Sequence, residues 1–197
     1  MYTVDFFRNF AQFNDIEEMD LHQFILFFDR EIANRKYTYI NSRGKIKSIK
    51  IEFRSDNFPH LIGLQHWYNL PIKQAAKQYE FLLSGEWDFD FLKKADEGSF
   101  KKYKKRFELL PFFYQMFYES NCEIKLTERE TNAGFKRRGV DMVFKRDDSG
   151  TSYLLELRQI GKFTYRPVSI SDHIPNSSSM HAKYLPLSIT EVQIEKL

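Results

Sequence analysis

The stretch Cys122-Glu123-Ile124-Lys125-Leu126-Thr127 marks a change in the pattern of the chain. In an extended strand, Cys122, Ile124 and Leu126 would share one face, and the polar residues between them would share the other. Strand patterns recur at four later ranges, which are 140–146, 152–158, 163–170 and 187–194. Strands that follow one another through short turns favour antiparallel pairing. The sequence therefore predicts a sheet over residues 122–197.

The chain before this sheet is mainly helical in pattern. Residues 15–34 carry apolar side chains at helical spacing, and Asn14 or Asp15 is suited to cap the start of that helix. Residues 36–40 and 46–54 alternate as the two arms of a hairpin, with Ile49, Ile51 and Phe53 on one face of the second arm.

A helical insert is expected over residues 70–120. Pro71 suits the first turn of its first helix, which ends near Gly85. A second helical region runs from about Ser99 to Glu119, and Pro111 is expected to kink or split it near Leu110 because proline lacks an N–H.

Helices separated from strands along a chain predict an α+β fold. We expect one domain over residues 1–197, with a helix and hairpin at 15–64, the helical insert at 70–120 and the sheet at 122–197. The sheet is predicted to be antiparallel, with about five to six strands.

Composition narrows the function classes. The chain has 197 residues, is 42% hydrophobic and carries a net charge of +3, which is too close to neutral to identify a nucleic-acid partner by itself. Cys122 is the single cysteine, so an internal disulfide is excluded and the thiol is expected to pack as a small buried group. The sequence shows no signal peptide or long apolar run, so we expect a soluble, cytoplasmic protein with no membrane partner.

The segment Phe58-Pro59-His60-Leu61-Ile62-Gly63-Leu64 follows the predicted hairpin. Pro59 restricts the backbone beside His60, and imidazole is the side chain whose ordinary pKa, about 6.5, suits proton transfer near neutrality. In one interpretation His60 is a catalytic acid or base. In the other, His60 bonds a nearby carbonyl and helps to cap a turn.

Three short motifs together resemble a known family. These are the FPHLIGL segment, Leu157-Arg158 on a predicted strand, and Tyr165-Arg166-Pro167-Val168-Ser169-Ile170 on the next. The pattern resembles the phage-type nucleases of the Barnase–EndoU–colicin–RelE superfamily, and within it the fourth phage class. The resemblance implies an endoribonuclease that acts without metal or other cofactor, in a toxin-like or phage-conflict role. It also implies RNA as a partner and an inhibitory, antitoxin-like protein as a second.

Metal-independent RNA cleavage by 2′-OH attack needs proton donors and acceptors together with cations for the phosphorane. His60 would transfer protons, and Arg158 would stabilise the phosphate with its planar fork of N–H donors. The other candidate catalytic residues are Arg54, Tyr165 and Ser169. The candidate substrate-binding residues are Lys125, Lys162 and Arg166. For Arg158 the structural alternative is an ion pair with Glu156 or packing of its aliphatic stem.

A second nuclease class has a similar outline. Asp141, Glu156 and Arg158 are spaced loosely like the PD-(D/E)xK enzymes, in which an Asp and a Glu hold Mg²⁺ beside a lysine. Here an arginine stands where that lysine would be, and a guanidinium is a poor base. The histidines and Cys122 form no set with the spacing of a metal site.

The alternative to an enzyme is a binding module. Basic residues are dense at Lys93–Lys94, at Lys101–Arg106 and at Lys136–Arg138, where they would lie along RNA or an acidic protein surface. Phe100, Tyr103 and Phe107 are interleaved with them at helical spacing, which favours a core-facing stripe over base stacking.

Overall fold

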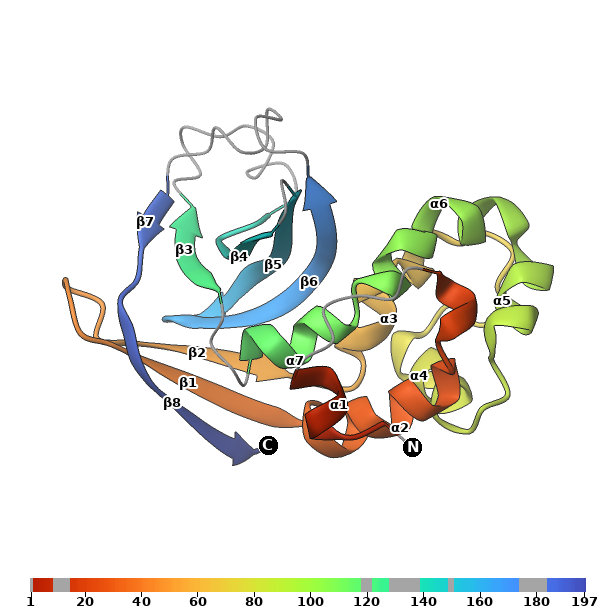
Figure 1. The fold of residues 1–197 in the computed structure, drawn as a ribbon, viewed down its shortest axis with the longest axis horizontal. Helices are drawn as coiled ribbons and strands as arrows, with labels where there is room; N and C mark the ends of the chain where they lie inside the picture. The colour runs from red at the N-terminus through yellow and green to blue at the C-terminus, as the bar shows by residue number, and fades with distance from the viewer. Residues whose placement is uncertain (1, 9–14, 118–121, 128–138, 149–150, 174–183) are drawn as a thin grey trace. The chain divides into compact units, whose positions relative to one another are not determined.

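The computed structural model describes residues 2–8, 15–117, 122–127, 139–148, 151–173 and 184–197 (Figure 1). The chain divides into two compact units, each built from two segments of sequence. Unit 1 comprises Met1–Asn34 and Arg54–Gln115, and unit 2 comprises Arg35–Phe53 and Met116–Leu197. The predicted basic run Lys136–Arg138 falls outside the described residues. The proposal of one domain over 1–197 stays a prediction.

Unit 1 is helical. Its long helices are α2 (Leu21–Glu31), α4 (Ala75–Leu83) and α6 (Glu97–Glu108). The shorter elements are α1 (Val4–Arg8), η1 (Ile16–Glu18), α3 (Asn57–Leu61), η2 (Leu64–His66), α5 (Phe89–Ala95) and α7 (Pro111–Phe117), whose last residues pass into unit 2.

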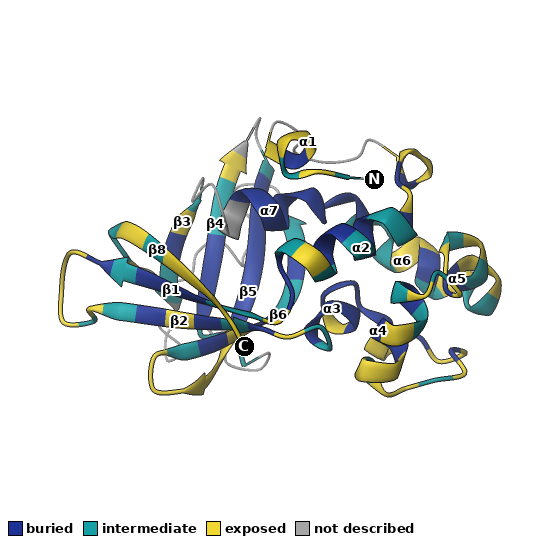
Figure 2. Cartoon of the chain, turned by 90° about the horizontal axis from the view of Figure 1, so that it is seen from below, coloured by how far each residue is buried: buried dark blue, intermediate teal, exposed yellow. Residues whose placement is uncertain are grey.

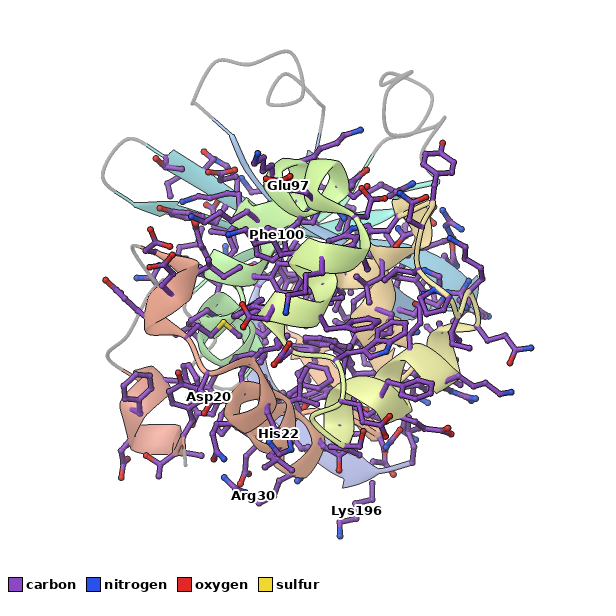
Figure 3. All side chains as sticks on the ribbon, turned by 90° about the vertical axis from the view of Figure 1, so that its right-hand side faces the viewer. Asp20, His22, Arg30, Glu97, Phe100 and Lys196 are labelled. Atoms are coloured by element: carbon purple, nitrogen blue, oxygen red, sulfur yellow. The ribbon has the colours of Figure 1, made fainter. Side chains whose placement is uncertain are left out.

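Side-chain caps set where the helices begin. The Asp20 carboxylate accepts a hydrogen bond from the Gln23 N–H at 2.9 Å and so starts α2, with Asp20 and His22 labelled at that end in Figure 3. The predicted cap Asp15 instead begins the 3₁₀ turn η1, accepting from the Glu17 N–H at 3.2 Å. The predicted helix over 15–34 is therefore two elements, because each aspartate supplies its own cap.

The segment predicted as a helical insert is helical, but the bounds and number of its helices differ from the prediction. Pro111 is the first residue of α7, and α6 ends at Glu108, so the predicted division near Leu110 is confirmed. The first helix starts at Ala75 rather than Pro71. Helix α5 was not predicted; Asp88 caps it by accepting from the Phe91 N–H at 2.7 Å.

Aromatic rings form the core of unit 1. Phe58, next to His60 in sequence, is fully buried, and its ring centroid lies 4.7 Å from that of Phe28 and 6.2 Å from that of Tyr79. Phe100 and Phe107 on α6 are buried, as predicted, and Figure 3 labels Phe100 among the other side chains of this unit. In Figure 2 the helices α2 and α6 are buried along one side and exposed along the other. The amphipathic pattern of the sequence thus positions the segment that carries His60.

Unit 2 contains one sheet of eight strands in the order β7-β3-β4-β5-β6-β2-β1-β8. The hairpin strands are β1 (Arg35–Asn41) and β2 (Ser48–Phe53). The others are β3 (Glu123–Thr127), β4 (Met142–Asp148), β5 (Thr151–Gly161), β6 (Thr164–His173), β7 (Tyr184–Pro186) and β8 (Ile189–Lys196). Figure 1 shows the curl of this sheet from β3 to β6.

The α+β class is confirmed, and two details of the predicted sheet are wrong. The described sheet has eight strands rather than five to six, partly because β7 has three residues, too few to show alternation. Pairing is antiparallel except between β2 and β6, which run parallel, with Ile51 opposite Tyr165. This parallel pair joins the hairpin to the later strands.

The second arm of the hairpin is as predicted. Ile49, Ile51 and Phe53 are fully buried, while Lys50 between them is exposed. Figure 2 shows the buried colour along β5 and alternating colours on β2. Among the described residues, no helix has the length and apolar character needed to cross a bilayer.

Candidate active site

A row of directly opposed residues crosses four strands of unit 2 and is polar on three of them, β3, β5 and β6. Lys125 on β3 lies opposite Val143 on β4, Val143 lies opposite Glu156 on β5, and Glu156 lies opposite Ser169 on β6. Residues directly opposite in a ladder place their side chains on the same face of the sheet. Lys125, Glu156 and Ser169 therefore share one face, which we call the polar face.

Arg158 and Arg166 extend the polar face. They lie directly opposite each other on β5 and β6, and both are exposed. Arg158 shares a face with Glu156, two residues earlier on the same strand. Arg166 joins that face because the register shifts between Glu156 and Leu157, leaving Val168 as an extra residue on β6. Without this bulge, Arg166 and Ser169 would lie on opposite faces.

The Arg158 side chain is held against the backbone that precedes β4. Its Nε donates to the carbonyl oxygen of Gly139 at 3.2 Å. Gly139 has φ +65, and a Cβ added there would lie 3.0 Å from the same Nε. A side chain at position 139 would thus strain the backbone and press on the guanidinium group.

Asp141 supports the strand that carries Arg158. Its carboxylate accepts from the Gln159 N–H at 2.8 Å, and its own N–H donates to the Leu157 carbonyl oxygen at 2.9 Å. The two bonds bracket Arg158 on β5, so Asp141 acts here as a structural carboxylate.

Tyr165 lies on the other face of the sheet. It is opposite Gln159 and adjacent to Arg166, and it is 3% exposed. Burial, followed by the charge of Asp141, raises the pKa of its phenol. A protonated phenol at neutral pH can donate a hydrogen bond. The structure does not bring Tyr165 together with Arg158 and Ser169.

The charged residues at the β3 side of the polar face are paired. Lys125 lies 2.6 Å from Glu123, and Lys145 lies 2.7 Å from Asp147. Burial raises the pKa of the Asp147 carboxyl, but hydrogen bonds from Lys145 and Ser152 and the nearby lysine charges outweigh it, so the net pKa is lowered. The lysines at the β3 side are thus paired with carboxylates. The two arginines of the polar face, Arg158 and Arg166, lie at its β5–β6 end.

Lys162 lies in the turn between β5 and β6, with its Nζ 6.0 Å from the Phe163 ring centroid. It is exposed and two residues from β6. A strand-end lysine of this kind can contact a bound polyanion without belonging to the polar face itself.

His60 and Arg54 belong to unit 1, whereas Arg158, Tyr165 and Ser169 belong to unit 2. His60 is an exposed residue of helix α3, and Arg54 is exposed directly after β2. The Arg54 N–H donates to the Asn57 side-chain oxygen at 3.0 Å, which shapes the turn into α3. The positions of His60 and Arg54 are therefore described within unit 1.

Other features bear on the alternatives. Burial raises the pKa of the Cys122 thiol to about 12, which makes it a poor nucleophile at neutral pH.

Among the residues that the structure describes, no group of three His, Cys, Asp or Glu side chains is arranged to hold a metal ion. A pocket of about 620 Å³ lies between Arg43–Ile46 and Leu185–Ser188, and its described lining contains none of the candidate site residues.

Sequence reasoning missed two features of the polar face. The first is the place of Glu156, which is 2% exposed and lies in the row between Lys125 and Ser169. The sequence had indicated Glu156 only as an ion-pair partner of Arg158 or as a magnesium ligand. The second is the backbone of Gly139, because a glycine shortly before a strand is a signal of positive φ or close backbone approach, and Gly139 shows both.

Comparison with known proteins agrees with the motifs. The family described as phage-Barnase-EndoU-ColicinE5/D-RelE like nuclease 4 matches residues 20–191, which include α2, His60, Arg158 and Ser169. No curated protein and no solved structure matches the chain. The match extends over both units and nearly the whole described sheet. The chain therefore belongs to the phage-Barnase-EndoU-ColicinE5/D-RelE like nuclease 4 family.

Proposed function

We propose that this nuclease is an endoribonuclease that uses the polar face of unit 2 to handle the scissile phosphate. The observation that supports this most is the pairing of Arg158 with Arg166 on β5 and β6, both exposed and both on the face that carries Ser169. Like charges directly opposite in a ladder repel each other. A phosphate bound between them would offset that repulsion with charge-assisted hydrogen bonds.

In this proposal Arg158 is the catalytic cation. Its guanidinium is oriented by the Gly139 carbonyl oxygen, and a guanidinium presents a planar fork of N–H donors that matches phosphate oxygens. Ser169 adds a hydroxyl donor on the same face, and Arg166, Lys125 and Lys162 bind the flanking backbone. Attack of the 2′-OH on phosphorus expels the 5′-oxygen, so one group must take a proton and another must give one.

His60 is proposed as the residue that transfers protons, as the family resemblance implies. Arg54 is proposed as a further contributor through its positive charge. Tyr165 is also kept as a proposed contributor, although its protonated phenol lies on the other face of the sheet from Arg158 and Ser169. His60→Ala, Arg54→Ala and Tyr165→Phe test these three roles one at a time, by the rate of RNA cleavage that each variant retains. A toxin-like role held in check by an inhibitory protein is the biological context that we propose for such an activity.

The experiment incubates the protein with total RNA and, separately, with single-stranded DNA, each with Mg²⁺ or with EDTA. The proposal expects RNA fragments in EDTA and intact DNA, because DNA lacks the attacking 2′-OH. Cleavage that EDTA abolishes would favour the Mg²⁺-dependent alternative with Asp141 and Glu156. RNA that is bound but never cut would favour a binding module.

A further inference from the structure

A cluster of basic groups surrounds Tyr103 within unit 1. The His66 imidazole stacks on the Tyr103 ring, with centroids 5.6 Å apart and planes 14° apart. The Lys102 Nζ lies 5.3 Å and the Arg106 Cζ lies 5.0 Å from the centroid of the same ring. Both distances lie within the range in which an aromatic face attracts a cation. We call His66, Lys102, Tyr103 and Arg106 the Tyr103 cluster.

The backbone around Gly63 holds this cluster in place. Gly63 has φ +86, and a Cβ added there would lie 2.8 Å from Tyr103 Cδ1, so the ring rests directly on the glycine. Arg106 Nη1 donates to the Leu61 carbonyl oxygen at 3.2 Å. The Tyr103 ring is thus covered by His66 and Gly63, and it organises the cations rather than offering a face to a base.

The charges of the cluster act on one another. Partial burial lowers the pKa of the His66 imidazole, and so do the neighbouring Arg106, Lys102 and His60 side chains. The carboxylates of α6 bind other lysines: Glu97 lies 2.8 Å from Lys101, and Glu108 lies 3.1 Å from Lys105. Positive charge is therefore concentrated on the side of α6 that carries Tyr103 and faces His66.

We infer that the Tyr103 cluster is a binding site for a backbone phosphate of RNA, an inference that rests on the proposed ribonuclease function. A phosphate beside Lys102, Arg106 and His66 would relieve their mutual repulsion and favour protonation of the imidazole. The Gly63 N–H donates to the His60 carbonyl oxygen at 3.1 Å, so a strand held at this cluster would pass beside the residue proposed to transfer protons.

The test uses an oligoribonucleotide with 2′-O-methyl groups, which can bind but lacks the attacking hydroxyl. Its affinity is measured by fluorescence anisotropy at several salt concentrations for the full chain, Lys102→Ala and Lys101→Ala. Lys101 is the matched control, since it lies next to Lys102 in sequence but pairs with Glu97. We expect Lys102→Ala to weaken binding about three- to tenfold at low salt and to reduce the salt dependence, with Lys101→Ala close to the unchanged chain.

A second readout follows the His66 imidazole by NMR titration, without ligand, with the oligonucleotide and with inorganic phosphate. The oligonucleotide should raise the His66 pKa, and Lys102→Ala should reduce that rise. Equal affinities for the two lysine variants, or a His66 pKa unmoved by the oligonucleotide, would overturn the inference. A response to inorganic phosphate alone would also overturn it, in favour of a free-anion site. The expected binding result in a protein that never cuts unmodified RNA would leave the phosphate site standing and reject the ribonuclease function.

Discussion

The Nε of Arg158 donates a hydrogen bond to the carbonyl oxygen of Gly139 at 3.2 Å, across the start of β4. This bond holds the Nε edge of the guanidinium against the backbone that precedes β4. A backbone carbonyl before β4 thereby controls the orientation of a strand residue 19 positions later. Disturbing Gly139 is a way to misplace Arg158 without removing its charge.

We predict that Gly139→Ala lowers nuclease activity more than it lowers stability. Alanine at φ +65 costs about 1–2 kcal/mol of folding free energy, and its Cβ would meet the Arg158 guanidinium at 3.0 Å. Gly44→Ala is the matched control, because Gly44 has φ +80 but nothing within 4 Å of an added Cβ. Urea unfolding and RNA cleavage should show similar losses of stability for both variants but a loss of activity for Gly139→Ala alone. Equal activity in the two would contradict the assigned role of the contact.

Replacing Arg166 should separate stability from RNA binding. Arg166→Ala removes the charge opposite Arg158, so the fold is expected to gain about 0.2–1 kcal/mol. The same change removes a phosphate contact, so RNA affinity should fall, and the slope of log K against log salt should decrease by about 0.7. Thermal unfolding and binding titrations check the two effects. A variant that is both less stable and unchanged in RNA affinity would show that Arg166 only packs.

Packing of Phe58 should be essential to unit 1. Phe58→Ala removes a fully buried ring that contacts Phe28 and Tyr79, and a cost of about 3–5 kcal/mol in unfolding free energy is expected. Tyr68→Ala, at a residue 89% exposed, should change stability by less than about 0.5 kcal/mol. Chemical denaturation measures both variants. A loss below about 1 kcal/mol for Phe58→Ala would mean that α3 is not anchored by this ring.

Stability should depend on pH through His66. The pKa of His66 is lowered in the folded protein, so the unfolded chain, with an imidazole pKa of about 6.5, binds the proton more readily. The stabilising effect of a neutral His66 is complete above that value and is lost as the pH falls through the folded-state pKa. His66→Gln should therefore lose less stability than the unchanged chain between pH 7.5 and pH 5.5. If His66→Gln and the unchanged chain lost the same free energy of urea unfolding between the two pH values, this linkage would be refuted.

The sequence predicted those features that depend on local pattern. Alternation placed Ile49, Ile51 and Phe53 in the core, and the missing N–H of Pro111 predicted the division between α6 and α7. Helix α5 was missed because its start depends on the Asp88 cap rather than on a long apolar stripe. Strand β7 was missed because three residues carry no readable period.

The missed parts of the candidate site depend on contacts between residues distant in sequence. Arg166 and Ser169 share a face only through the bulge at Val168, which no alternation pattern reveals. The parallel pairing of β2 with β6 joins segments more than a hundred residues apart. The stacking of His66 on Tyr103 is a tertiary contact, which spacing along the chain does not reveal. The family motifs were enough to identify the nuclease class. The structure was needed to show which residues lie in one row across the sheet.

The most direct test of the ribonuclease proposal is single-turnover cleavage of RNA in EDTA by the unchanged chain, Arg158→Ala and Arg30→Ala. Arg30 is an exposed arginine of α2 paired with Glu31 at 2.7 Å, and it serves as the control for loss of one surface guanidinium. We predict a rate reduced about a hundredfold or more for Arg158→Ala, with Arg30→Ala unaffected and both variants folded. Undiminished cleavage by folded Arg158→Ala would contradict the proposal.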